Sequence, residues 1–124
     1  MSEYSTLTTT MSIDLKKFRI RIYKTAFHQI GDPKYIQLLV NLDEMVVAIR
    51  SVEYELPGDQ THRVSERQLR ADNSVEIYSR PFISKLCEVI NGLDVGNSYR
   101  LSGVVVPAEK TVFFPLKTLH IIES

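Results

Sequence analysis

The longest run of mostly apolar residues extends from Tyr35 to Leu56. Residues 35–42 are almost continuously apolar, which is typical of a strand covered on both faces. Towards the end of the run, Val52, Tyr54 and Leu56 alternate with polar residues, which predicts a strand with one buried and one exposed face. We therefore predict two antiparallel strands joined near residue 43, where Asp-Glu can turn the chain.

A short helix over residues 43–50 is the competing interpretation of the same stretch. The β-branched side chains Val46, Val47 and Ile49 disfavour it, because they lose rotamer freedom in a helix. Pro57-Gly58-Asp59 then predicts a turn that ends the second strand.

Further alternating segments predict strands on either side of this pair. They are residues 18–23, residues 75–79, residues 99–106 and residues 111–123. We expect the last two to form a hairpin with a short loop. Pro115 predicts that Thr111–Glu123 is an edge strand or carries a bulge, because proline has no backbone N–H to donate.

One segment, near residues 80–91, has the periodicity of a helix. Ser79 can cap its first turn and Pro81 is tolerated there. Phe82 and Leu86 begin an apolar stripe at helical spacing. Cys87 lies near that stripe, and we expect a small buried hydrophobic side chain rather than a nucleophile. A strand over the same residues stays open as the alternative.

The remaining segments predict loops and a tail. Residues 1–12 are rich in Ser and Thr and predict a flexible tail, with an edge strand as the alternative; residues 13–124 predict a single globular domain. Thr25–Lys34 predicts a loop. Residues 58–73 predict a long loop or a weak edge strand.

Composition limits the classes of protein to which the chain can belong. Its 124 residues carry 15 basic and 15 acidic side chains, so the net charge gives no global case for nucleic-acid binding. The single cysteine excludes a disulfide framework and fits a reducing compartment. No run approaches a membrane span and no secretory signal is evident, so we expect a cytoplasmic protein without membrane contact.

Catalytic and metal-binding motifs are missing from the sequence. Neither phosphate-binding glycine loops, H-E-x-x-H, C-x-x-C nor G-x-S-x-G occurs. The three histidines are scattered, and we expect His28 and His120 to lie on the surface. We therefore expect no catalytic residue, no metal site and no cofactor.

Local charge supports a nucleic-acid hypothesis that the net charge does not. The basic residues between 16 and 24, with Tyr23 available for stacking, are typical of a strand face that meets phosphate. The candidate nucleic-acid-binding residues are Lys16, Lys17, Arg19, Arg21, Tyr23, Lys24, Arg63, Arg67 and Arg70. The hypothesis requires the two basic groups to converge on one groove. The simpler interpretation is a solvated face paired with acidic neighbours such as Glu53 and Glu55.

The order of the predicted elements indicates a β-rich α+β fold, mostly antiparallel, with one helix near residues 80–91. One architecture is a small barrel of the oligonucleotide-binding type, in which a helix precedes the last hairpin. The other is a β-sandwich.

The sandwich is also what a partial family resemblance implies. Residues 34–70 resemble the opening of prokaryotic YEATS-type domains, through the pattern I-x-x-V-x-Y-x-L formed by Ile49, Val52, Tyr54 and Leu56. The resemblance implies an immunoglobulin-like sandwich, and eukaryotic relatives of that family bind acylated lysine through a Gly-Trp-Gly-type motif. This chain contains no tryptophan, so no ligand-binding residue is carried over.

Together these patterns favour a non-catalytic binding or protein-interaction module that acts through a protein partner or self-association. The proline-marked edge at Thr111–Glu123 is the surface that a partner strand could extend. One alternative is the single-stranded nucleic-acid-binding domain described above. Another is a small-molecule-binding protein or enzyme with a closed pocket beneath the helix.

Overall fold

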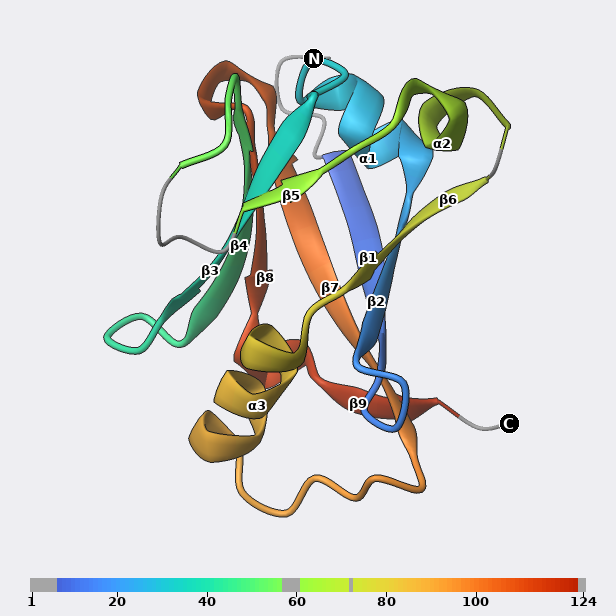
Figure 1. Cartoon of the computed structure of the whole chain (residues 1–124). Coiled ribbons are helices and arrows are strands. Elements are labelled where there is room, and N and C mark those ends of the chain that lie inside the picture. The colour runs from blue at the N-terminus through green and yellow to red at the C-terminus, as the bar shows by residue number, and fades with distance from the viewer. Residues whose placement is uncertain (1–6, 57–60, 72, 123–124) are drawn as a thin grey trace.

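The computed structural model describes residues 7–56, 61–71 and 73–122, and its nine described strands form one antiparallel sheet. The strand order is β5-β3-β4-β8-β7-β1-β2-β6, with β9 beside β7. In chain order the strands are β1 (Leu7–Asp14), β2 (Arg19–Tyr23), β3 (Tyr35–Asn41), β4 (Val46–Val52), β5 (Thr61–Arg63), β6 (Ser74–Tyr78), β7 (Ser98–Val106), β8 (Thr111–Pro115) and β9 (His120–Ile122). The eight strands of the path curl into a nearly closed barrel (Figure 1).

The barrel confirms the β-rich antiparallel α+β class and selects the barrel over the sandwich. Side chains of each strand point alternately inward and outward. The interior is apolar because most of the inward-pointing side chains are hydrophobic. Met11, Ile36 and Phe114 are fully buried there. The two ends of the path, β5 and β6, are consecutive strands joined through α2 (Glu66–Ala71), and they face each other across the opening (Figure 1).

Three helices close the ends of the barrel. α1 (Lys24–Gln29) and α2 lie at one end, and α3 (Arg80–Val89) lies at the other (Figure 1). The predicted helix is confirmed, including its cap, because the Ser79 hydroxyl accepts a hydrogen bond from the backbone N–H of Phe82 at 3.2 Å. The helices α1 and α2 were not predicted.

Several predicted loops are therefore wrong. Thr25–Lys34 contains most of α1, which buries Ala26 and Phe27. Residues 58–73 contain the edge strand β5, as the sequence allowed, but also α2. Both helices are six residues long, which leaves too few positions for a periodic signal.

The predicted tail is also wrong from Leu7 onward, while residues 1–6 lie outside the described part of the chain. Residues 7–14 form β1, which pairs with β7 on one side and β2 on the other. It is an interior strand rather than an edge. Its inward positions Met11 and Ile13 are buried, whereas its outward positions are small and polar, which hides the strand from a hydrophobicity pattern.

The second strand of the central pair ends earlier than predicted. β3 and β4 confirm the antiparallel pair, with Leu39 opposite Ala48. However, β4 ends at Val52, and Tyr54 is 67% exposed rather than buried. The predicted turn at Pro57-Gly58-Asp59 lies outside the described residues. At the other predicted strand, Phe18 has a φ of 53° and belongs to the turn that precedes β2.

The C-terminal segment is divided rather than continuous. Thr111–Glu123 was predicted as one edge strand, but it forms β8, a short 3-10 helix η3 (Leu116–Thr118) and β9. β8 pairs with both β4 and β7, so it is not an edge, and Pro115 ends it. The predicted hairpin of residues 99–106 with the following strand is confirmed by the β7–β8 pairing.

Gly103 of β7 packs against β8 with no room for a side chain. A Cβ atom at residue 103 would lie 2.7 Å from the carbonyl oxygen of Phe113 and would overlap the ring of Phe114. Phe114 is fully buried, so its ring has nowhere to move. Only glycine fits at this position.

We predict that Gly103→Ala lowers the free energy of unfolding by about 2–3 kcal/mol, because overpacking of a buried site displaces the backbone. Urea unfolding followed by circular dichroism measures this. Gly96→Ala is the control, since its added Cβ would meet only Asp94 Oδ1 at 3.4 Å, and it should change stability by no more than about 0.5 kcal/mol. Equal effects of the two substitutions would contradict the packing described here.

Candidate functional site

The outer surface of the barrel carries an apolar row that crosses four neighbouring strands. The register places Leu39 of β3 opposite Ala48 of β4, Ala48 opposite Phe113 of β8, and Phe113 opposite Val104 of β7. All four side chains point away from the core, because their strand neighbours Leu38, Val47 and Val112 are the buried ones. Leu39 and Val104 are 36% and 39% exposed. We call this row, with Val46 and Pro115 beside it, the apolar face.

The apolar face lies in a groove that continues onto the tip of the β3–β4 hairpin. The groove has a volume of about 890 Å³. Leu42 and Met45 of the tip line it together with every residue of the apolar face except Val104. The hairpin projects from the body of the barrel (Figure 1), and these two side chains are 49% and 44% exposed.

The tip has a defined conformation. Asn41 Oδ1 accepts hydrogen bonds from the backbone N–H groups of Asp43 and Glu44 at 3.0 and 3.1 Å. Met45 adopts a φ of 52°, a region that side chains other than Gly and Asn seldom occupy. The chain therefore presents large apolar side chains at a turn where small polar residues are usual.

Polar groups border the apolar face on two sides. On one side the outward residues of the next row are Gln37, Arg50 and Thr111, and the Arg50 guanidinium donates to Gln37 Oε1. At the tip end, Glu44 and Lys117 line the groove, and neither forms an ion pair with another described residue. An apolar centre with a polar rim is the usual composition of an interaction surface.

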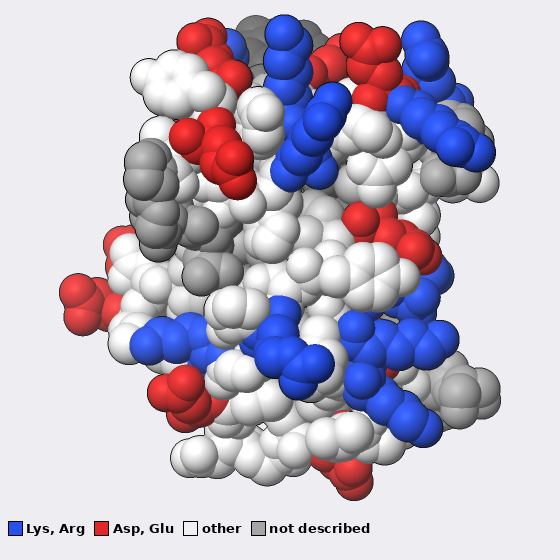
Figure 2. All heavy atoms as spheres, in the orientation of Figure 1, with Lys and Arg blue, Asp and Glu red and all other residues white. Residues whose placement is uncertain are grey.

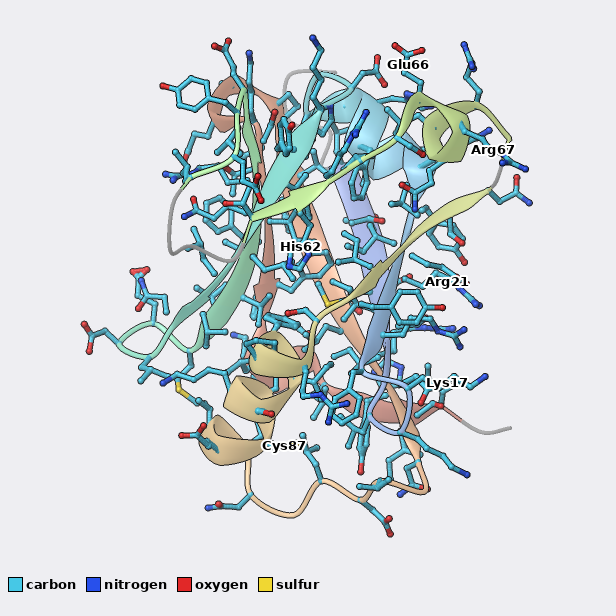
Figure 3. The ribbon with its side chains drawn as sticks, in the orientation of Figure 1. Lys17, Arg21, His62, Glu66, Arg67 and Cys87 are labelled. Carbon is cyan, nitrogen blue, oxygen red and sulfur yellow. The ribbon has the colours of Figure 1, made fainter. Side chains whose placement is uncertain are left out.

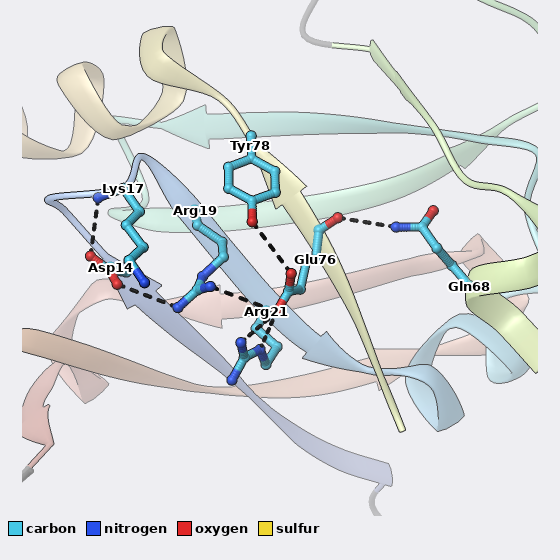
Figure 4. A network of polar contacts seen from close by, with 7 residues as sticks. All are labelled: Asp14, Lys17, Arg19, Arg21, Gln68, Glu76 and Tyr78. Carbon is cyan, nitrogen blue, oxygen red and sulfur yellow. Dashed lines mark hydrogen bonds and ion pairs between the residues drawn. The ribbon is translucent and has the colours of Figure 1, made fainter. Parts of the chain in front are cut away.

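The predicted basic strand lies on the outer surface of the opposite half of the sheet, and acidic side chains pair with it. Glu76 of β6 accepts from Arg21 Nε at 3.0 Å and lies 3.8 Å from Arg19, which also contacts Asp14 at 3.4 Å (Figure 4). The hydrogen bond from Arg21 lowers the pKa of Glu76 below its usual range. Burial opposes this shift, whereas the charges of Arg21 and Arg19 and the hydrogen bond from the Tyr78 hydroxyl reinforce it.

Pairing of the basic strand is thus observed, but not with the predicted partners. Glu53 and Glu55 follow β4 and are not the partners, because β2 lies between β1 and β6. The carboxylates that pair with it belong to Asp14 and Glu76.

The second group of predicted basic residues does not share the first group's position. Arg67 and Arg70 lie on α2, and Arg63 lies on β5. Lys24 of the first group contacts the second group, because its Nζ donates a hydrogen bond to the Arg70 carbonyl oxygen at 3.5 Å. Lys17, Arg21 and Arg67 follow one edge of the molecule in Figure 3. Figure 2 shows basic side chains gathered at both ends of this edge, with acidic side chains between them. The two basic groups lie along one side of the molecule, but none of the hollows described here is lined by both groups. Lys16 and Lys17 are exposed in the β1–β2 turn.

His62 lies at the opening between β5 and β6 (Figure 3). It is opposite Ile36, on the inward side of β5. Its Nε2 is buried and has no hydrogen-bond partner among the described residues. Burial lowers the pKa of His62 below its ordinary value of 6.5, because the charged imidazolium loses hydration.

The proposed pocket beneath the helix is not closed. The hollow between α3 and β3 has a volume of about 280 Å³, opens to solvent, and is lined by five apolar side chains and the exposed Lys85. Cys87 is exposed on α3, so the prediction that it is buried is wrong. His28 and His120 are exposed, as predicted.

Within the described ranges, no three His, Cys, Asp or Glu side chains are grouped as metal ligands would be. No helix in the described part of the chain has the length and apolar composition needed to cross a bilayer.

Sequence patterns did not reveal the apolar face as a surface. The continuous apolar run over residues 35–42 predicts a strand buried on both faces, so it does not indicate that Leu39 faces outward. Arg100 was also missed, since it is an isolated basic residue within β7, and only the strand register brings it near Arg21.

The chain matches no known protein family, no curated protein and no solved structure. The resemblance of residues 34–70 to YEATS-type domains therefore stays a prediction.

We predict that the protein loses stability as the pH falls below about 6.5, because unfolding allows His62 to bind a proton that the folded state disfavours. His62→Leu should reduce this dependence, as measured by thermal unfolding between pH 7.5 and 5 at constant ionic strength, about the range of histidine titration. His120→Leu, at an exposed histidine, is the matched control and should leave the dependence in place. An unchanged dependence in His62→Leu would contradict this assignment.

Proposed function

We propose that the protein is a non-catalytic interaction module that self-associates through the apolar face and the β3–β4 hairpin tip. The observation that carries the proposal is the row Leu39–Ala48–Phe113–Val104, an uninterrupted apolar line across four strands on the outside of a barrel. Contiguous apolar surface rimmed by polar groups is typical of a protein-binding site.

A second copy of the chain is the partner that the charges at the rim favour. In a two-fold dimer every contact occurs twice: if residue i of one copy contacts residue j of the other, then residue j of the first copy contacts residue i of the second. Glu44 and Lys117 line the same end of the groove and have no described ionic partners. Two copies related by a two-fold axis at this end would place each Glu44 against a Lys117 and form two reciprocal ion pairs.

The size of the apolar face predicts the strength of the dimer. The apolar face contains one or two outward residues on each of four strands. A length of about three residues of 3.4 Å on strands spaced about 4.8 Å apart gives a face of roughly 200 Å². Stable interfaces bury about 800 Å² per partner. The exposed hairpin tip adds contact beyond the face, so we expect a reversible dimer with a dissociation constant in the micromolar range.

We predict that Leu39→Glu weakens the dimer at least about tenfold, because a charge replaces a buried leucine side chain at the centre of the interface. Sedimentation equilibrium over a range of protein concentrations measures the dissociation constant. Val95→Glu is the matched control, since Val95 is 59% exposed in the loop before β7 and does not line the groove. A monomeric wild-type chain at the highest concentration, or equal effects of both variants, would refute the proposal.

The proposed ion pairs between Glu44 and Lys117 can be tested by exchanging the two charges. Glu44→Lys and Lys117→Glu should each weaken the dimer several-fold, because each places like charges together twice in the interface. The double variant restores opposite charges and should recover most of the wild-type affinity. Additive weakening in the double variant would show that Glu44 and Lys117 do not meet across the interface.

A further inference from the structure

A polar groove follows the outer side of β1, on the opposite half of the sheet from the apolar face. The outward residues of β1 are small, whereas β2 places Arg19 and Arg21, and β7 places Arg100, at facing positions. Ser12 lies between Arg21 of β2 and Arg100 of β7. Thr10 lies opposite Ser102 of β7 and lines the same hollow as Tyr23. The strand therefore forms a floor with hydroxyl groups, and the arginines and Tyr23 form its walls.

Three hollows join end to end along this floor. The first two have volumes of about 260 and 280 Å³ and share Ser12, Arg21 and Arg100. The third continues from the second through the shared residues Thr10 and Tyr23. From Thr8 to Asp14 the groove is roughly 20 Å long, and its walls stand about 10 Å apart, two strand spacings. These dimensions suit one extended polymer strand.

Arg100 is the unpaired cation of this groove. Its Nε is buried and has no hydrogen-bond partner among the described residues. Arg19 and Arg21, by contrast, are held by Asp14 and Glu76. A charged group without an acceptor is costly to bury, and an anionic oxygen bound in the groove between Arg100 and Arg21 would supply the Arg100 guanidinium with an ionic partner. Arginine forks are suited to phosphate oxygens.

Tyr23 adds a second type of contact. Its ring is 52% exposed and lines the second and third hollows, next to the arginines. Cations that follow a narrow groove, together with an exposed aromatic ring, are the features that bind single-stranded nucleic acid without sequence preference. We propose that this groove binds a short single-stranded nucleic acid, with phosphates at Arg100, Arg21 and Arg19 and a base stacked on Tyr23.

Glu76 would then limit the affinity, because it competes with phosphate for Arg21 and Arg19. Removal of its charge should therefore strengthen binding, while removal of a groove cation should weaken it. The hollows of the groove share no lining residue with the apolar face, although Thr8 lies opposite Val104. Oligonucleotide binding and self-association are therefore tested with different variants.

The test is fluorescence anisotropy of a labelled deoxythymidine oligonucleotide as a function of salt. With three arginines engaged, the logarithm of the association constant should fall with the logarithm of the salt concentration with a slope of about −2. Arg100→Ala and Tyr23→Ala should each weaken binding about tenfold, and Glu76→Gln should strengthen it. Lys85→Ala, which removes an exposed cation from α3, is the matched control and should leave binding unchanged.

Circular dichroism and thermal unfolding verify that each variant folds. If Arg100→Ala does not fold, the exposed Tyr23→Ala and the opposite effect of Glu76→Gln still decide the question. The proposal is overturned by any of three results: no binding at low salt, equal binding by all variants, or displacement by inorganic phosphate as effective as by unlabelled oligonucleotide. Tighter binding of a duplex of the same length would also contradict it.

Discussion

The two halves of the barrel meet at β7. The pairing of β7 with β8 depends on Gly103, which has no Cβ to contact Phe113 and Phe114 of β8. β7 pairs with β8, β1 and β9, so it joins the β5-β3-β4-β8 half of the sheet to the β1-β2-β6 half. At Gly103 the absence of a Cβ leaves room for the ring of Phe114 inside the barrel. A side chain there would separate β7 from β8 and move the two halves relative to each other.

The apolar face and the polar groove along β1 both lie on the outside of the barrel. Apolar side chains of the strands and helices fill the barrel, and the hollow beneath α3 is open and shallow. The outer surfaces of the two halves differ in chemistry. The β3-β4-β8 half presents the apolar face, whereas the β7-β1-β2 half presents hydroxyls, arginines and Tyr23. One sheet thus offers two surfaces that suit different partners.

Sequence patterns were sufficient to predict a strand or helix where the local hydrophobic pattern was strong. The continuous apolar run predicted β3 and β4, and the cap at Ser79 with its apolar stripe predicted α3. They were insufficient where tertiary pairing determined the structure. β1 has polar outward residues and gains its stability from β7 and β2 on both sides, which no local pattern records. Similarly, Pro115 was read as the mark of an edge, but it ends an interior strand.

The residues of the candidate sites also divide into those that a local pattern indicates and those that only strand pairing brings together. Arg19, Arg21 and Tyr23 could be selected from the basic strand, but their acidic partner Glu76 comes from a strand 55 residues away. The outward direction of Leu39 and Phe113 could not be predicted, because a strand apolar on both sides gives no alternation from which to assign its faces. These features follow from strand register, and register is set by the whole fold.

The central claim is that the apolar face and hairpin tip are an interface between two copies of the chain. Methyl NMR spectra recorded from dilute to concentrated protein test this most directly, because methyl groups report contacts residue by residue. Self-association through this surface should shift the methyl signals of Leu39, Leu42 and Met45 as concentration rises, with no change at the interior residues Leu38 and Leu101. Spectra that do not change with concentration, or shifts confined to other surfaces, would contradict it.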